Sequence, residues 1–488
     1  MLSYRFRWVY CQLEILRQCL PPSVRCILDE LPETLDETYE RVLKDIKKVN
    51  REHAIRLLHC LTVAIRPLRV DELAEVLAID FDAARREGIP KLNPNWRWAD
   101  QHQAVLSTCS SLITVVDDGN SQVVQFSHFS VKEYLTSNRL ANANGDVSRY
   151  YIRPESAHTI LAQACLGVLL RFDEHVVNYH TVKNIPLAMY AAGHWVDHAQ
   201  FKGVSSRIRD AMEYFFDADK PHFAAWHRVH NIDTGWFGLS GCRGGPLYYA
   251  SLCGFHDLAK RLVVKHPEHV NARGGRMESP LGAALEGGHL QVAELLYEHG
   301  AEVGVRGDYE WTLLHLLSLG GLGGSVDTGH WLLNRGADVN AQTQTGICWT
   351  PLHLAVRNQQ LETVRTLLEH HADIHAQGPR GEVALHLAAC HHGSQFQANV
   401  LQLLLDHGAD VNARDNEGST PLHYSSFRNK DGHSGSGKGS VECTRLLLEH
   451  GADIDAENNK GDTPFMVALG AEHHEMAEFL WGLGTMFV

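Results

Sequence analysis

The sequence predicts a mostly α-helical protein: an α-solenoid of about seven helix pairs, preceded by a small domain that ends in a β-hairpin and by a helical connector. In the second half, the phrase Thr-Pro-Leu-His stands at residues 350–353 and returns at 420–423, each time after a turn. An apolar run that closes on Gly-Ala-Asp follows at a fixed distance, as in 446–453. In the first half, short helical patterns give way to two strand-like runs. Self-similarity at such a period is typical of a stacked solenoid rather than of a globular enzyme domain.

Each part of the repeated phrase has a physical role. Thr350 is a good N-cap because its hydroxyl accepts an unpaired amide of the first turn, and Pro351 suits the first helical position, where no N–H is needed. Adjacent leucines at 403–405 diverge by roughly 100° on a helix, so that helix must be buried on two sides. Gly408 and Gly451 supply the positive φ that ends a helix.

The spacing of the predicted helix starts identifies the repeat type. Consecutive starts are 33 to 43 residues apart, at Pro246, Pro280, Leu313, Pro351, Ala384, Pro421 and Pro464. The shortest steps match the roughly 33-residue ankyrin unit of a turn and two helices. The extra residues, at 320–324, 391–394 and 431–440, all fall between an inner and an outer helix, where a loop absorbs them at little cost. The segment from about 241 to the C-terminus therefore resembles an ankyrin-repeat array.

The fourth repeat departs from this pattern at one position. Where other repeats have Gly300, Gly336, Gly408 or Gly451 before Ala-Asp, or in one case before Ala-Glu, it has His371. We expect His371 to adopt positive φ at a cost of about 1 kcal/mol relative to glycine. His371→Gly should therefore raise the melting temperature.

Length and composition bound the class of protein. A chain of 488 residues suggests two or three domains, and its net charge of −14 disfavours a nucleic-acid or anionic-membrane surface. The eleven cysteines include no Cys-x-x-Cys pair, so we expect reduced, mostly buried thiols. Charged residues interrupt the apolar N-terminus, and the apolar stretch 160–170 is shorter than the roughly 20 residues of a membrane span. A cytoplasmic protein is expected.

The first half reads as a succession of short helices. A helical pattern over 6–20 ends at Pro21-Pro22, a second begins at Thr34 with a capping box to Glu37, and a third follows Asn50 as its N-cap. A fourth spans 70–77 and a fifth 104–112. Strands are predicted at 113–116 and 122–126, joined by a turn at Asp118-Gly119. Helices followed by a hairpin in this order predict a winged helix.

A winged helix raises the alternative of DNA binding. The would-be recognition helix, 103–111, contains no Arg or Lys, and the wing carries Asp117 and Asp118. Reading a groove and neutralising phosphates both need cations. The segment is therefore predicted to be a packing domain.

Several blocks of the first half look like fungal NACHT-ankyrin proteins, which are STAND NTPase-like. The stretches 6–13, 31–39, 66–73 and 126–135 resemble the C-terminal helices and winged helix that follow the nucleotide-binding core of that family, and 186–195 resembles its helical connector. Such proteins are similar to signal-transducing NTPases that sense a ligand through repeats. The resemblance implies a helical remnant at 1–49, a winged-helix-like domain at 50–140, a connector at 141–240 and the ankyrin array at 241–488.

The P-loop that this family would need is not found. Its order, G-x-x-x-x-G-K-[ST], has only a near-match at 432–439, where Gly439 follows Lys438 in place of the magnesium-binding hydroxyl. That stretch is a Gly/Ser-rich insertion within a repeat and is predicted to be a linker. The chain begins where the core would have ended, which fits either a natural short form or a truncated gene model. We expect packing rather than a nucleotide contact for His128.

The thirty-two histidines suggest metal binding, but their pattern does not support it. Adjacent pairs such as His370-His371 diverge on a helix, and no Cys or carboxylate partner stands at a useful spacing. Histidines at one helical position in successive repeats predict a structural hydrogen-bonding role: His315, His353, His386 and His423. No catalytic signature stands out, so we expect no enzyme, no metal and no cofactor.

The sequence therefore predicts a protein–protein interaction scaffold that uses the concave face and turn tips of the ankyrin array. The alternative is the regulatory half of a NACHT-type switch whose core is missing from this chain. Partner contacts are predicted at non-framework tip positions: Arg306, Gln342, Gln344, Arg380, Glu382, Arg414, Asn416, Asn458 and Lys460.

Overall fold

The computed structural model of the chain forms two compact units, Met1–Trp236 and Phe237–Val488. Each unit is described by itself. The structure describes residues 34–484 except for 110, 120, 144, 174–176, 231–243, 308–309, 321–325, 344–347, 391–394 and 427–440. The helix predicted over 6–20 and the P-loop near-match at 432–439 lie outside the described residues.

The first unit opens with the predicted short helices. α3 (Leu35–Asp45) begins with the expected capping box, in which the Thr34 side chain accepts the Glu37 amide at 3.2 Å. α4 (Arg51–Val63) starts after Asn50 as predicted, but the Asn50 side chain makes no capping hydrogen bond, so that prediction is wrong. α5 (Val70–Val76) and α7 (Gln101–Cys109) follow. Between them stand an α-helix and two short strands that the sequence did not reveal, α6 (Phe81–Glu87), β2 (Ile79–Asp80) and β3 (Lys91–Leu92).

The wing is a three-stranded antiparallel sheet in the order β1-β5-β4. β4 (Ile113–Asp118) pairs with β5 (Ser121–Phe126), as expected. Asp118 pairs with Ser121, so the turn lies one residue later than predicted. The third strand, β1 (Leu68–Arg69), has two residues and pairs with β5, and it was not predicted because two residues carry no periodicity.

The connector packs on the winged helix and forms one unit with it. α10 (Pro154–Leu169) lies against both α4 and α12 (Ala188–Ala199). The core of the connector is aromatic: the rings of Trp195 and Trp226 lie 5.6 Å apart, and the Trp226 indole N–H donates to the Ala192 carbonyl at 2.9 Å. The other α-helices among the described residues of this unit are α8 (Phe129–Leu135), α9 (Asn138–Ala141), α11 (Tyr179–Lys183), α13 (Val204–Arg207), α14 (Arg209–Phe215) and α15 (Pro221–Val229).

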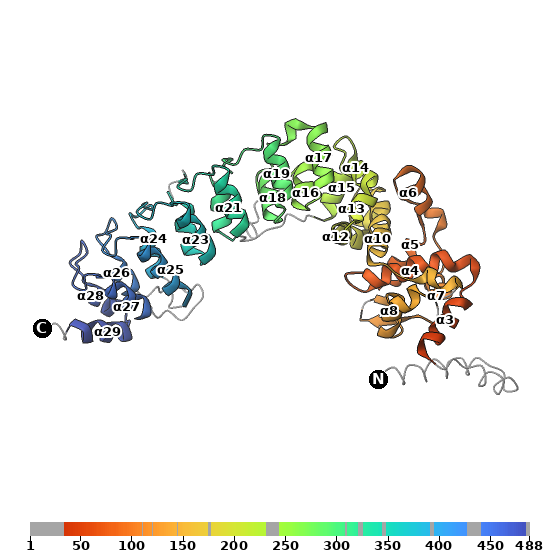
Figure 1. Cartoon of the computed structure of the whole chain (residues 1–488), viewed down its shortest axis with the longest axis horizontal. Helices are drawn as coiled ribbons and strands as arrows, with labels where there is room; N and C mark the ends of the chain where they lie inside the picture. Colours follow the sequence, from red (N-terminus) through yellow and green to blue (C-terminus); the bar gives the residue numbers. More distant parts are fainter. Residues whose placement is uncertain are drawn as a thin grey trace. The chain divides into compact units, whose positions relative to one another are not determined.

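The second unit is a row of seven helix pairs (Figure 1). The inner helices begin at the seven predicted starts: α16 (Pro246–Leu252), α18 (Pro280–Glu286), α20 (Leu313–Ser318), α22 (Pro351–Arg357), α24 (Ala384–Cys390), α26 (Pro421–Ser426) and α28 (Pro464–Gly470). The outer helices are α17 (His256–Lys265), α19 (Leu290–Glu298), α21 (Val326–Asn334), α23 (Leu361–Glu369), α25 (Gln395–Asp406), α27 (Val441–Glu449) and α29 (His474–Gly484).

The core of the array is shared between neighbouring pairs, as the adjacent leucines predicted. Leu352, Leu367, Leu385, Leu404 and Leu447 belong to one buried cluster although they come from three different pairs. A single pair has too little apolar surface to fold alone, so each repeat depends on its neighbours. The flanking helices place each of the three predicted insertions between an inner and an outer helix.

The turn that follows the outer helices has the predicted backbone. Gly300, Gly336, Gly408 and Gly451 have φ of 84° to 90°, and His371 has φ of 62° at the equivalent position. Six cysteines have side chains that the structure describes; all six are free thiols, and five of them are buried. None of the helices in the described part of the chain has the length and apolar character needed to cross a membrane.

Candidate partner-binding surface of the repeat array

The repeated Thr-Pro-Leu-His phrase builds a hydrogen-bonded cap that also reaches the next repeat. The His353 amide donates to Thr350 Oγ1 at 3.5 Å, and the Thr350 amide donates to His353 Nδ1 at 3.2 Å. Because Nδ1 accepts a hydrogen bond, the ring proton must lie on Nε2. That atom is 3.3 Å from the carbonyl oxygen of Glu382, which belongs to the following repeat. His353 therefore donates a hydrogen bond from its own helix to its neighbour.

Four consecutive repeats share this arrangement, which we call the histidine ladder. In each, Nε2 lies 3.0 to 3.3 Å from the carbonyl of the residue just before the next cap, namely in the pairs His315–Trp349, His353–Glu382, His386–Ser419 and His423–Asp462. Burial lowers the pKa of all four imidazoles, so they stay neutral in the folded protein. The structural role predicted for these histidines is confirmed.

The repeats at the two ends of the array have other residues at the position that the ladder histidines occupy. In the first repeat, the Tyr248 hydroxyl accepts the Met277 amide at 3.1 Å, which reverses the direction of the bond. The second repeat has Gly282, and the seventh has Met466, which is 51% exposed. The ladder is thus confined to the central repeats within the described part of the array.

Further hydrogen bonds hold the turn tips in a row. The Asn416 amide donates to the Arg380 carbonyl at 2.9 Å, and the Asn459 amide donates to the Glu417 carbonyl at 2.8 Å. An Arg414 guanidinium N–H donates to the Glu457 carbonyl at 2.8 Å. These bonds cross from one repeat to the next, so the tips have fixed spacing.

The structure separates the nine predicted contact residues into three groups. Gln342, Arg380, Asn416 and Lys460 are exposed on tips, and the Arg380 guanidinium has no carboxylate partner among the described residues. Gln344 lies outside the described residues. The other four, Arg306, Glu382, Arg414 and Asn458, form hydrogen bonds within the framework of the array.

Two of the predicted contact residues, Arg306 and Arg414, bridge neighbouring tips. Arg306 donates to the Gln342 carbonyl at 2.9 Å, much as Arg414 does to its neighbour. Asn458 is half-buried, and its side-chain oxygen accepts the amides of Lys460 and Asp462 at 2.9 and 3.0 Å. These three side chains fix the shape and spacing of the tips.

Glu382 does not lie on the surface where the sequence placed it. It is only 4% exposed, and it accepts the Trp349 indole N–H at 3.3 Å and the Arg380 amide at 2.7 Å. The Arg357 guanidinium lies 4.6 Å from the centre of the Trp349 ring. Sequence reasoning missed Trp349 and Arg357. The sequence feature that could have indicated Trp349 is its place just before a helix N-cap, a position that faces the next repeat.

The motif residues of the first unit are occupied in packing. Glu72, within the stretch 66–73, is buried, accepts two hydrogen bonds from the Arg66 guanidinium at 2.6 and 2.8 Å, and accepts the Arg69 amide at 2.9 Å. His128 caps α8 by accepting the Ser130 amide at 3.2 Å, and its ring lies on Phe129, which is 52% exposed. Local structure therefore accounts for both.

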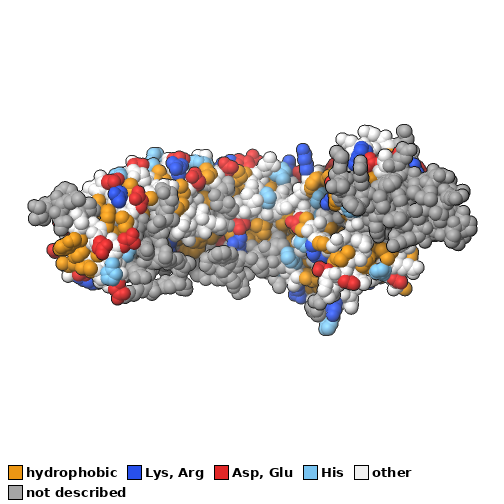
Figure 2. All heavy atoms as spheres, turned by 90° about the horizontal axis from the view of Figure 1, so that it is seen from below, with side chains coloured by type: hydrophobic (Ala, Val, Ile, Leu, Met, Phe, Trp, Pro, Cys, Tyr) orange, Lys and Arg blue, Asp and Glu red, His pale blue; other side chains and the backbone are white. Residues whose placement is uncertain are grey.

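The face that Figure 2 presents shows no large field of one charge among the described residues. On the face that Figure 2 presents, acidic, basic and histidine side chains are interspersed along the array. In the winged helix, the wing residues Asp117 and Asp118 are exposed, and the described part of α7 carries no Lys or Arg. A nucleic-acid interface would need a concentration of cations.

Comparison with known families agrees with this architecture. Residues 247–343 and 352–434 match "Ankyrin repeats (3 copies)", and residues 433–480 match "Ankyrin repeats (many copies)". Residues 39–146 match "GPI inositol-deacylase, winged helix domain". The chain is thus mostly α-helical, with an ankyrin array and a winged-helix domain, as the sequence predicted.

Similarity to individual proteins covers parts of the chain. It is 30% identical over 297 residues to "Azaphilone pigments biosynthesis cluster protein L" of Monascus ruber, a match that covers 57% of this chain and 61% of that protein. It is 38% identical over 63 residues to "Alpha-latrocrustotoxin-Lt1a" of Latrodectus tredecimguttatus, which covers 13% of this chain and 4% of the toxin. It is 31% identical over 126 residues to mouse "Ankyrin repeat and SAM domain-containing protein 6", which covers 26% of this chain and 14% of that protein. The matches therefore span less than two thirds of each of these relatives.

Proposed function

We propose that this chain is a non-catalytic, cytoplasmic scaffold that binds a protein partner through the exposed tips of its ankyrin array. What supports the proposal most is a division between two sets of polar side chains. The cap threonines, the histidine ladder and Glu382 complete hydrogen bonds inside the array. Gln342, Arg380 and Asn416 stand exposed on tips that backbone hydrogen bonds hold at fixed spacing. A preorganised polar row loses little conformational entropy when a partner binds, which favours affinity.

The proposal is tested at one tip residue with a matched control. Proteins captured by the full chain from a cell extract are identified and purified, and the Kd of each is measured for the wild type and for three variants, Arg380→Glu, Asn416→Asp and Arg365→Glu. Arg380→Glu changes a tip. Arg365→Glu reverses the same charge on outer helix α23, where Arg365 is 48% exposed and 3.8 Å from Glu362.

We expect Arg380→Glu to weaken binding by about tenfold or more, since one interface hot spot contributes roughly 1 to 2 kcal/mol or more. Arg365→Glu should leave the Kd nearly unchanged. Equal affinities for the wild type, Arg380→Glu and the corresponding Asn416→Asp variant would remove the tips from the interface and refute the proposal.

A second candidate function is the regulatory half of a NACHT-type, nucleotide-dependent signalling switch. It is favoured by the winged-helix match at 39–146 and by the likeness to a fungal protein over 57% of this chain. Large aromatic side chains also lie on the surface of the first unit, Trp96 at 47% and Trp98 at 51% exposure, and suit contact with another domain. Sequencing of full-length transcripts tests this candidate. A frame encoding G-x-x-x-x-G-K-[ST] upstream would support it, and transcripts without one would count against it.

A further inference from the structure

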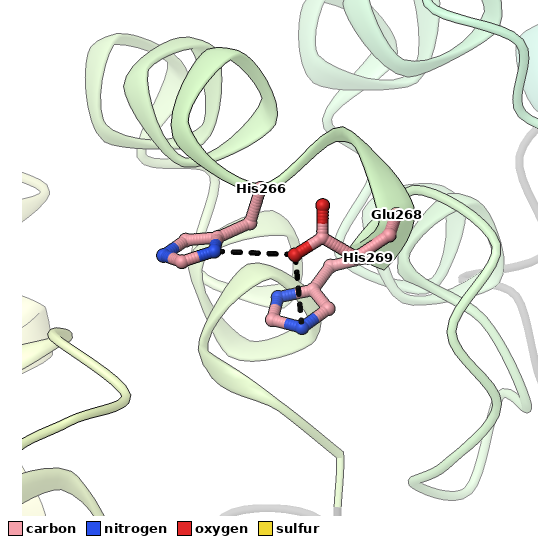
Figure 3. A group of neighbouring side chains, drawn as sticks. All are labelled: His266, Glu268 and His269. Carbon is pink, nitrogen blue, oxygen red and sulfur yellow. Dashed lines mark hydrogen bonds and ion pairs between the residues drawn. The ribbon is translucent and has the colours of Figure 1, made fainter.

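Three potential metal ligands come together just after the outer helix of the first repeat. α17 ends at its C-cap His266, and a short 3-10 helix, η5 (Pro267–His269), follows directly. The Nδ1 atom of His266 lies 3.3 Å from Glu268 Oε1, and the Nε2 atom of His269 lies 3.9 Å from the same oxygen (Figure 3). One ligand atom from each residue fits within a span of 4.8 Å. No second group of three such residues is found in the described parts of the chain.

The local backbone explains why these side chains converge. Pro267 ends α17 and starts a 3-10 turn, in which residues three apart lie on the same side. His266 and His269 are therefore neighbours, with their ring centres 5.0 Å apart and their planes 19° from parallel. Figure 3 shows a Glu268 oxygen directed towards both rings. The sequence prediction concerned adjacent histidines on an α-helix, and it did not consider histidines three residues apart in a 3-10 turn.

The donor set matches a borderline transition-metal ion. Two imidazole nitrogens and one carboxylate oxygen suit zinc, which accepts three protein ligands and keeps a fourth position for water. Tetrahedral bonds of about 2.0 to 2.2 Å would separate the ligand atoms by roughly 3.3 to 3.6 Å, so small side-chain rotations bring the observed distances into range. Calcium and magnesium prefer an all-oxygen shell.

The three side chains are open to solvent. The side chains of His266, His269 and Glu268 are 25%, 38% and 63% exposed, so an ion can reach them.

We propose that His266, Glu268 and His269 form a binding site for a divalent transition-metal ion, with zinc as the best match. A bound ion would join the C-cap of α17 to η5. Because the folded turn brings the three ligands together and the unfolded chain does not, binding would also stabilise the first repeat.

The test uses the full chain, freed of metal by chelation, and three variants. Zinc affinity is measured in competition with a chromophoric chelator, and Co²⁺ reports tetrahedral coordination through its visible absorption. H266N/H269N removes both imidazoles, and E268Q removes the charge of the carboxylate with little change in shape. The matched control is H330N/H370N, a pair whose Nδ1 and Nε2 atoms lie 3.2 Å apart elsewhere in the array. Circular dichroism without zinc checks that each variant is folded.

We expect one tight zinc equivalent and a tetrahedral Co²⁺ spectrum in the wild type, both retained in the control and lost in H266N/H269N. E268Q should weaken zinc binding by at least about tenfold. Loss of a residue that only hydrogen-bonds to a metal ligand already lowers metal affinity by about that factor, and Glu268 would be a ligand itself. The zinc-induced rise in melting temperature should disappear in the same variants. Unchanged zinc affinity in H266N/H269N or in E268Q, or an equal loss in the control, would overturn the proposal.

Discussion

The turn after each of the outer helices from α19 to α27 contains one residue with positive φ. Substitutions at this residue can measure the free-energy cost of that backbone conformation with little change in packing. His371 has φ of 62°, and the glycine at the equivalent position of the next repeat, Gly408, has φ of 89°. A Cβ atom placed on Gly408 meets no atom within 4 Å, and His371 is itself exposed. Exchanging residues at these two positions therefore changes backbone strain and leaves packing nearly constant. The perturbations are His371→Gly and Gly408→Ala.

The expected magnitudes follow from two opposing terms. A left-handed conformation costs a residue with a Cβ about 1 kcal/mol or slightly more. Glycine recovers that cost but gives the unfolded chain roughly 0.4 to 1 kcal/mol of additional conformational freedom. The free energy of unfolding should therefore rise by about 0.5 kcal/mol for His371→Gly and fall by a similar amount for Gly408→Ala. For a unit of this size, the first change corresponds to roughly 1 to 2 °C in melting temperature.

The assay is urea and thermal unfolding of the full chain, followed by circular dichroism. The double variant His371→Gly/Gly408→Ala should return close to the wild type, since the two positions are in different repeats and act on separate turns. A His371→Gly protein that is less stable than the wild type would refute the reasoning, because glycine would then confer no advantage at a position with positive φ.

Three further predictions concern other parts of the chain. The four ladder histidines have pKa values lowered below 6.5, so the unfolded chain binds more protons below that pH. Their contribution to the free energy of unfolding should be fully present above about pH 6.5 and should fall as the pH drops, by up to roughly 1.4 kcal/mol per pH unit for each histidine. The His353→Gln variant should show a shallower dependence of stability on pH, and an equal slope in that variant would contradict this prediction. Glu72→Ala should lower the free energy of unfolding in urea by about 2 kcal/mol, because it removes the buried carboxylate that accepts hydrogen bonds from the Arg66 guanidinium and the Arg69 amide. Glu40→Ala, at a surface pair with Lys44, should cost less than about 1 kcal/mol. Equal costs would show that the buried acceptor adds nothing. Gly282→Ala should lower the melting temperature of the array, because the added Cβ would lie 2.4 Å from the Met277 carbonyl oxygen. This clash should outweigh the helix preference of alanine over glycine, which is about 1 kcal/mol. A more stable Gly282→Ala protein would show that the backbone shifts to relieve this contact.

The parts of the fold that sequence reasoning predicted correctly are those set by local chemistry. The seven inner-helix starts were placed to the residue, because a cap and a first-position proline act within one turn. Asn50 failed as a cap although its residue type was suitable, because its backbone is already helical, with φ of −97° and ψ of −7°. The two-residue strand β1 depends on pairing with β5, and no local pattern reveals it.

The surface was predicted less completely than the fold, for a related reason. Glu382 occupies a turn position that resembles exposed neighbours, yet Trp349 of the preceding repeat covers it and binds its carboxylate. That contact joins residues 33 positions apart and depends on the identity of both. The group at 266–269 was missed because the sequence reasoning considered adjacent histidines only, whereas His266 and His269 are three residues apart and meet across a 3-10 turn.

The histidine ladder also makes the junctions between repeats chemically asymmetric. Each imidazole offers its proton only to the C-terminal neighbour, so a cut through the ladder exposes an unused N–H on one fragment and a bare carbonyl on the other. Met466 fills the corresponding place in the seventh repeat and requires no acceptor. A shorter version of this array should therefore be built by excising a whole central repeat and rejoining two identical junctions, and not by trimming from the C-terminus.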